Sequence, residues 1–491
     1  MLTQRSHISG KIEPIMLSST LLLSKPSIDL SKKFDFKVAS PQVVRPIQYL
    51  GSKVNVLDQI TPVLKNLSCS DSAFFDLFAG TTVVAQSMRD HCTVISNDSM
   101  KYSKIFGDVF VVGPSNLYET MLDASGIIDS DPFIENSKYL CDVFKDFLDK
   151  ENEALINLDE MLLAEVNREI PLFWKKGIPK SKRVSKLLSS ISHDEANYSF
   201  PAFLLTTYYA GNYFGLRQAI ELDSLVYAVH HLFAEKQITN WQKTAYISSV
   251  LSAASDIANT AGKHFAQYLQ TGDSEKSYFA NSRCIQDRSI SVIDKFILWT
   301  KKISAYDFVN NNSNRSLNFQ FEDIVENYIL KGKSDQFVSK NIGDIRVGTL
   351  YADPPYTAQQ YSRFYHVLET ISLYDYPSIQ LDQSGFSTKG IYRKERHYSP
   401  FCRKSKAMEY FMHLFKFAKD LNATLALSYS VSRAEGGNPR MVTPEELSGL
   451  AKDMSMKFLS YQVDHEYKPF NSSEKLLKHT AGREYLFIFE S

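Results

Sequence analysis

Residues 73–85 read AFFDLFAGTTVVA, and this stretch decides the fold of the chain. Its apolar first half predicts a buried strand, Gly80 predicts a turn, and the residues up to Met88 are compatible with a helix. Residues 91–98, HCTVISND, predict the next strand, which ends in Asp98. A strand, a glycine turn, a helix and a second strand ending in an acid form a nucleotide-binding βαβ unit, in which the acid binds ribose hydroxyls. The G-x-G spacing of a dinucleotide fingerprint is missing, which disfavours a hydride-transfer enzyme.

A second stretch, residues 347–356 (VGTLYADPPY), predicts a buried strand that stops at two prolines. The residues after it should lie at the carboxyl end of a strand, where open α/β sheets bind ligands. A carboxylate and a proline carbonyl can accept from an exocyclic amine, while an aromatic ring can stack on a flat base. This favours a site for the amino group of a nucleobase, although a plain turn uses the same residue types. The candidate catalytic residues are Asp353, Pro354, Pro355 and Tyr356.

A third motif, residues 45–53 (RPIQYLGSK), precedes these two. With the three motifs in this order, the chain resembles the alpha group of N6-adenine-specific DNA methyltransferases over residues 41–491. The resemblance implies that S-adenosylmethionine is the cofactor and that Lys53 approaches its carboxylate. Residues 81–82, two threonines, depart from the family pattern, because relatives commonly have a second glycine there. The cofactor-binding residues that the resemblance implies are Tyr49, Gly51, Lys53, Asp76, Phe78, Gly80, Asn97, Asp98 and Asp323, although an ordinary helix N-cap would look like Asp323.

The resemblance also implies the architecture. The fold class is α/β: a Rossmann-like S-adenosylmethionine-dependent methyltransferase sheet with helices on both faces, plus an inserted, mostly helical DNA-recognition region. The expected parts are an N-terminal extension (1–40), a cofactor-binding half (41–110), the helical insertion (111–315) and a catalytic half (316–491). Apolar spacing predicts helices over 216–233 and 241–269, and later strands are expected over 424–430, 457–463 and 484–489.

Composition sets broad limits. A chain of 491 residues is too long for one compact core, so about two or three subdomains are expected. No apolar stretch approaches the length of a membrane span, and the N-terminus does not resemble a secretory signal. The five cysteines are scattered without a C-x-x-C pair, so neither a metal site nor a disulfide framework is implied, and a cytoplasmic location is the default expectation.

The net charge is zero, which argues against a protein that coats nucleic acid, but a DNA enzyme can concentrate its positive charge on one face. Two stretches could do so. The first is as compatible with a solvated basic loop as with DNA contact. It contains Lys175, Lys176, Lys180, Lys182, Arg183 and Lys186. The second is predicted to bind DNA, because aromatic residues stand among its cations, which are Lys389, Arg393, Lys394, Arg396, Arg403 and Lys404.

The predicted reaction transfers the methyl group of S-adenosylmethionine to N6 of an adenine that has flipped out of double-stranded DNA. N6 is a poor nucleophile, so the enzyme must chiefly position it; Asp353 and the Pro354 carbonyl would stabilise its developing positive charge. His366 is expected to have a surface or helix-packing role rather than to act as a base. The expected setting is a restriction-modification or phage-defence system, with a possible cognate endonuclease as partner and a monomeric chain.

Alternatives stay open at the level of sequence. N4-cytosine methylation is the nearest, because it also uses an exocyclic amine; Asp353 favours adenine, since cytosine enzymes more often have serine there. RNA could replace DNA as the substrate. From another class, the chain could be a catalytically silent DNA-binding subunit that keeps the fold. The recognition sequence cannot be predicted, because it depends on side chains of the variable region.

Overall fold

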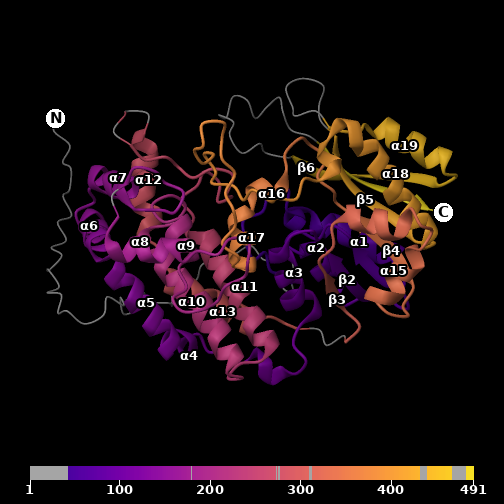
Figure 1. The fold of residues 1–491 in the computed structure, drawn as a ribbon. Helices are drawn as coiled ribbons and strands as arrows, with labels where there is room; N and C mark the ends of the chain where they lie inside the picture. Colours follow the sequence, from indigo (N-terminus) through magenta and orange to yellow (C-terminus); the bar gives the residue numbers. More distant parts are fainter. Residues whose placement is uncertain are drawn as a thin grey trace, which may run out of the picture. The chain divides into compact units, whose positions relative to one another are not determined.

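A computed structural model describes residues 43–178, 180–272, 274, 277–308, 312–431, 440–466 and 483–490. All of them belong to one compact unit. Within these residues, seven strands form one mixed sheet with the order β3-β2-β1-β4-β5-β7-β6 (Figure 1). The strands are β1 (Ala73–Asp76), β2 (Thr93–Asn97), β3 (Arg315–Leu317), β4 (Val347–Ala352), β5 (Thr424–Val431), β6 (Lys457–Glu466) and β7 (Arg483–Glu490). The strands predicted from sequence are therefore confirmed, within a few residues at their ends.

Strands β1 to β5 run parallel, whereas β7 is antiparallel to both β5 and β6. The register aligns the ends of the central strands, because Asp76 pairs with both Ser96 of β2 and Tyr351 of β4. The turn after β1, the acid after β2 and the proline pair after β4 therefore leave the sheet at one edge. Neighbouring parallel strands place ligand sites at this edge.

Alternate residues of the central strands face opposite cores. Phe74 and Tyr351 pack in one core, while Phe75 and Leu350 pack in the other. The first core is covered by η1 (Lys53–Val56), α1 (Leu57–Leu67) and α2 (Val83–Met88). The second is covered by α14 (Phe321–Ile324), η5 (Val325–Ile329), α15 (Ser334–Asn341), α18 (Lys404–Asp420) and α19 (Pro444–Asp453). Both faces of the sheet are thus buried under helices.

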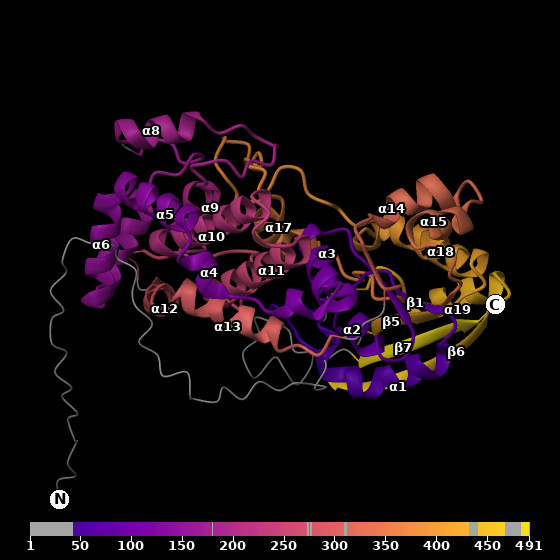
Figure 2. The same cartoon turned by 90° about the horizontal axis from the view of Figure 1, so that it is seen from below.

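The described elements between β2 and β3 are all helices. The first two pack against β2 and β3, and most of the others gather beside the sheet (Figures 1 and 2). In chain order, the helices are α3 (Lys101–Gly107), η2 (Asp108–Val112), η3 (Leu117–Thr120), α4 (Ala124–Ile128), α5 (Asp131–Val143), α6 (Lys145–Ile156), α7 (Glu160–Glu169), α8 (Lys182–Ser189), α9 (Leu204–Tyr208), α10 (Leu216–Ala234), α11 (Asn240–Ile257), α12 (Tyr278–Arg288) and α13 (Val292–Ser304). The helix predicted over 216–233 is confirmed by α10. The helix predicted over 241–269 is wrong in its second half, because the chain extends at Ala258 (φ −56°, ψ 129°) and turns at Gly262 (φ +86°).

Two helices after β4 connect this helical region to the sheet. α16 (Tyr361–Phe364) follows the loop after β4, and α17 (His366–Leu373) packs against both α3 and α11. The Glu369 carboxylate of α17 accepts from the backbone N–H groups of Lys101 and Tyr102 at the start of α3, at 3.0 and 3.3 Å. His366 is 1% exposed and its Nε2 lies 3.0 Å from the Phe265 carbonyl oxygen, which confirms a packing role.

Across the part of the chain that the structure describes, no helix has both the length and the apolar character needed to cross a membrane.

Candidate active site

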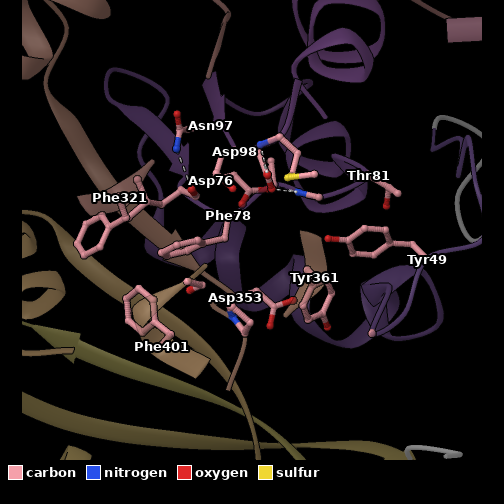
Figure 3. Close-up of a pocket in the computed structure, with 18 of the residues that line it drawn as sticks. Tyr49, Asp76, Phe78, Thr81, Asn97, Asp98, Phe321, Asp353, Tyr361 and Phe401 are labelled. Carbon is pink, nitrogen blue, oxygen red and sulfur yellow. Dashed lines mark hydrogen bonds between the residues drawn. The ribbon is translucent and has the colours of Figure 1, made fainter. Parts of the chain in front are cut away.

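A pocket opens where β1, β2 and β4 end (Figure 3). It holds about 950 Å³ of space, part of it open to solvent, which suits a small-molecule ligand. Of the predicted cofactor-binding residues, all except Asp323 line it. Asp353 and Pro355 of the predicted catalytic loop line it as well. Motifs that are up to three hundred residues apart in sequence therefore surround one cavity.

The turn after β1 depends on Gly80, whose φ of +52° lies in the left-handed region. A Cβ at this position would lie 2.9 Å from the Tyr49 ring, so glycine is required by the surroundings as well. The Gly80 N–H donates to Asp98 Oδ2 at 2.9 Å, and the Met100 N–H donates to Oδ1 at 2.9 Å. Burial raises the pKa of Asp98 although both donors act against the shift. The carboxylate is thus held in one orientation at the pocket wall.

Thr82 lies in the turn where the sequence departs from the family pattern. Its backbone is left-handed (φ 62°, ψ 13°), a conformation that a β-branched residue rarely adopts and that glycine adopts freely. The Thr82 hydroxyl donates to the Thr81 carbonyl at 2.7 Å and accepts from Gln86 Nε2 at 3.2 Å. These hydrogen bonds hold Thr82 in its left-handed conformation.

Aromatic rings form the two sides of the pocket. Figure 3 shows Phe78, Phe321 and Phe401 together on one side and Tyr49 opposite them. The Phe78 ring centroid lies 5.8 Å from that of Phe321 and 5.4 Å from that of Phe401. Tyr49 is held in place by stacking on Tyr365, with 4.7 Å between the centroids. A flat heterocycle fits among such faces.

Asp76 lies between these sides and is 1% exposed. Its Oδ1 has no hydrogen-bond partner among the described residues. Burial raises the pKa of Asp76 well above its usual value, and the negative charges of Asp353 and Asp98 add to the shift. A buried acceptor without a donor at a pocket wall indicates a ligand that brings a donor or a positive charge.

Lys53 contacts the predicted catalytic loop directly. Its Nζ lies 2.7 Å from Asp353 Oδ2 and 3.2 Å from Glu484 Oε1. Burial alone would lower the pKa of Lys53, but the two carboxylates raise it well above its usual value. Burial raises the pKa of Asp353 to about 6, with the Lys53 ammonium acting against the shift and Glu484 adding to it. The sequence did not predict this pairing, since Lys53 was expected to face the cofactor's carboxylate.

The rest of the catalytic loop faces β5. Pro354 is buried, and the Tyr356 ring packs 5.2 Å from the ring of Tyr429, outside the residues that line the pocket. The Arg440 guanidinium lies 4.9 Å above the Tyr356 ring and donates to the Ser430 backbone oxygen at 2.6 Å. In the sheet, β5 and β1 flank β4 on its two edges. The loop after β4 is therefore held by residues at β5, whereas the Gly80 turn follows β1.

The structure does not bring Asp323 to the pocket, because its side chain is exposed on α14. Its neighbour Glu322 lines the pocket instead, and its Oε1 lies 2.9 Å from His397 Nε2. Neither residue was predicted. The placement of Asp323 at the pocket was therefore wrong by one position, and no sequence signal connects Glu322 to a histidine 75 residues away.

Comparisons with known proteins agree with this geometry. The family model described as D12 class N6 adenine-specific DNA methyltransferase matches residues 49–169 and 296–425, about half of the chain. The chain belongs to this family. It is 24% identical to the modification methylase LlaI of Lactococcus lactis subsp. lactis over 88% of its own length and 53% of the relative's. It is 24% identical to the type II methyltransferase M.FokI of Planomicrobium okeanokoites, over 90% and 52%.

A third relative of the D12-class chain is the type II methyltransferase M.NlaIII of Neisseria lactamica, at 34% identity over 33% of the chain and 42% of the relative. The chain spans about half the length of LlaI and M.FokI. No solved structure matches it.

The basic residues predicted to bind DNA in the D12-class chain differ in exposure and in their protein partners. Lys389, Lys394 and Arg403 are exposed. Arg393 is not available to DNA, because its guanidinium is buried and forms two bonds to the Asp375 carboxylate, at 2.7 and 2.6 Å. Two further members have protein partners: Arg396 donates to Gln380 and Tyr398, and Lys404 donates to the Met441 carbonyl.

The two basic stretches, predicted separately, meet in space. Lys176 Nζ of the first lies 5.8 Å from the ring centroid of the exposed Phe386, three residues before Lys389. Asp194, which follows the first stretch, accepts from the N–H of Ser378, which precedes the second, at 3.0 Å. This bond links the chain segments next to the two stretches.

Proposed function

We propose that this D12-class chain transfers the methyl group of S-adenosylmethionine to N6 of an adenine at one specific sequence in double-stranded DNA. The observation that carries the proposal is that Asp353 lines the same pocket as the Gly80 turn and Asp98. An acceptor for an amine thus borders a site built for a nucleoside. The names of the relatives support the restriction-modification setting, with a cognate endonuclease as partner.

The residues present fit S-adenosylmethionine. Asp98 would accept from ribose hydroxyls, and the adenine ring would lie among Phe78, Phe321 and Phe401. Asp76 has the free buried acceptor that a positively charged group requires. When bound, the cofactor supplies an electrophilic methyl group on a sulfonium sulfur, and the carboxylates of the pocket match its positive charge.

The chain's own residues would then orient the target amine. Asp353 and the Pro354 carbonyl accept from N6, so its lone pair points at the methyl carbon. N6 would gain positive charge as it takes the methyl group, and the fixed Asp353 carboxylate would stabilise that charge more than it stabilises the ground state. The proton that N6 loses goes to water. The adenine reaches this position only after flipping out of the duplex, and Tyr356 offers a ring for stacking.

We infer further that the sheet is the Rossmann-like sheet of S-adenosylmethionine-dependent methyltransferases. Its parallel strands, its antiparallel β7 and the helices on both faces support this assignment. Residues 41–110 then form the cofactor-binding half, 111–315 the DNA-recognition region and 316–491 the catalytic half. The exposed cations Lys176, Lys389, Lys394 and Arg403 would contact the DNA backbone.

The test is modification-sensitive sequencing of DNA from a methylation-free host that expresses the chain. We expect N6-methyladenine at one short motif, its absence with Asp353→Ala, and its presence with Asp344→Ala, which removes an exposed carboxylate just before β4. Modified cytosine would identify an N4-cytosine enzyme instead. Unmodified DNA from a chain that binds S-adenosylmethionine would contradict DNA as the substrate and direct the search to RNA. A chain that does not bind the cofactor would be a silent DNA-binding subunit.

A further inference from the structure

Glu484 is a buried carboxylate that the proposed reaction does not use. It lies near the start of β7 and is 5% exposed. It is not one of the residues that line the pocket. Sequence predicts only a closing strand at this position. A buried acid close to a reacting group requires a reason, since desolvation of a carboxylate is costly unless it is paired.

The contacts of Glu484 lead to the catalytic loop. One oxygen, Oε1, lies 3.2 Å from Lys53 Nζ and accepts from the Ser428 hydroxyl at 2.7 Å. The same Lys53 ammonium lies 2.7 Å from Asp353 Oδ2. One cation is therefore shared by two carboxylates, and only one of these borders the pocket.

The register of the sheet fixes this arrangement. Glu484 pairs with Ser430 in the antiparallel β5–β7 ladder, so Ser428, two residues earlier, is its diagonal neighbour on the same face. Ala352 pairs with Leu427 in the parallel β4–β5 ladder, so Asp353 leaves the sheet beside Ser428. The sheet itself thus sets the distance between the two carboxylates.

The charges of the cluster have a direct consequence for Asp353. Lys53 contacts its Oδ2, and among the described residues the hydrogen bond to the Asp353 carboxylate comes from Lys53, with none to Oδ1. If Lys53 had no second carboxylate, its whole field would act on Asp353 and weaken it as an acceptor. Glu484 gives the ammonium a second partner and makes the three-group cluster net negative, which favours a positive charge developing next to it.

We propose that Glu484 is a positioning residue for methyl transfer: it shares the Lys53 ammonium with Asp353, so that one Asp353 oxygen stays free as a strong acceptor for the target amine. The inference rests on the proposed function and adds to it a residue that touches neither substrate nor cofactor. It acts through the shared Lys53 ammonium and through its own charge near Asp353.

The test is the pH dependence of the single-turnover methylation rate. The charged and titratable groups that face Asp353 are Lys53, Glu484, Asp76, Tyr351 and Tyr356. Asp353 must be ionised to accept, so the wild-type rate should fall as pH drops through about 6, the raised pKa of Asp353. In Glu484→Gln the plateau rate should fall about tenfold or more. The acid limb of its pH–rate profile should move to lower pH, because the Glu484 charge, which adds to the effect of burial on the pKa of Asp353, is gone.

The control is Glu490→Gln, on the same strand, which removes a surface carboxylate 3.3 Å from Lys457 and should change neither quantity. Ser428→Ala is the second variant, because it loosens Glu484 without removing a charge; it should lower the plateau rate less than Glu484→Gln. Binding of S-adenosylmethionine should stay within about threefold of wild type in all three variants. A plateau rate that is unchanged in Glu484→Gln, or an acid limb that stays in place, would overturn the proposal.

A readout without catalysis separates this proposal from the proposed function. The Asp353 carboxyl carbon, identified by comparison with Asp353→Asn, can be titrated by carbon-13 NMR in the full chain. Its midpoint should fall in Glu484→Gln and not in Glu490→Gln, whether or not the chain methylates DNA. An unchanged midpoint contradicts the role of Glu484, whereas a shifted midpoint in a chain without methyltransferase activity contradicts only the proposed function.

Discussion

Either the left-handed backbone or the lack of space for a Cβ could require glycine at position 80. A comparison with Gly332 distinguishes the two. Both Gly80 (φ +52°) and Gly332 (φ +64°) have left-handed backbones. A Cβ on Gly80 would lie 2.9 Å from the Tyr49 ring, whereas a Cβ on Gly332 has no atom within 4 Å. Conformational strain is therefore common to both positions, and steric conflict with the pocket wall belongs to Gly80.

We predict that Gly80→Ala weakens S-adenosylmethionine binding about tenfold, since overpacking costs roughly 1–3 kcal/mol and must move Tyr49 or the turn. Gly332→Ala should leave binding unchanged. Gly332→Ala should lower the free energy of unfolding by about 1 kcal/mol, the cost of a left-handed alanine. Gly80→Ala should lower it by about 2–4 kcal/mol, because overpacking against Tyr49 adds to that cost. Isothermal titration and urea unfolding measure the two effects. Equal binding by both variants would show that the Tyr49 contact is not part of the cofactor site.

The residues that sequence could find share one property: their chemistry is concentrated in a few adjacent positions. Asp353 follows its strand and precedes two prolines, and Asp98 ends the strand after a glycine turn. Glu484, Glu322 and His397 could not be found in this way. Each acts through a partner distant in sequence, such as His397 for Glu322, 75 positions away, and tertiary contacts of this kind leave no local pattern.

At the scale of elements, strands were easier to place than helix ends. The apolar run before Asp353 matches β4 (Val347–Ala352) at both ends, because two prolines stop it. α11 ends at Ile257, although alanines and other helix-compatible residues continue to Ala261. Its end is set by the turn at Gly262 and by the Lys263 ammonium, which donates to the Ala258 carbonyl at 2.9 Å. Periodicity alone does not report such an end.

The segment between α17 and α18 contains cations of two kinds, and this leads to a prediction. Arg393 forms a buried, two-bond ion pair with Asp375, whereas Arg403 is exposed. Arg393→Ala should lower the free energy of unfolding by about 3–5 kcal/mol, because it leaves the Asp375 carboxylate buried without its partner. Arg403→Ala should change it by no more than about 0.5 kcal/mol.

For DNA affinity, Arg403→Ala should have the larger effect of the two variants. Arg403→Ala should weaken binding, and folded Arg393→Ala should bind as the wild type does, in a filter or fluorescence assay at fixed salt. If Arg393→Ala lost DNA affinity without losing stability, Arg393 would be a DNA contact and the ion pair a feature of the free protein.

At the scale of the whole molecule, the net charge is zero, so the proposed DNA binding requires a local basic surface. The contacts between Lys176 and Phe386 and between Asp194 and Ser378 bring two basic stretches together, although about two hundred residues separate them in sequence. Sequence could name both stretches but could not show that they are neighbours. We therefore expect the phosphate backbone of the DNA to contact cations of both stretches.

Salt dependence tests this surface. We predict that Lys389→Ala, Lys394→Ala and Arg403→Ala in one variant reduce the slope of log affinity against log salt by up to about 2.7, if each cation neutralises one phosphate. The control removes three exposed lysines near α15, Lys331, Lys333 and Lys340, and changes the net charge equally. Its slope should equal that of the wild type, and S-adenosylmethionine affinity should be unchanged in both. A slope that falls equally in both variants would mean that overall charge, rather than this surface, attracts the DNA.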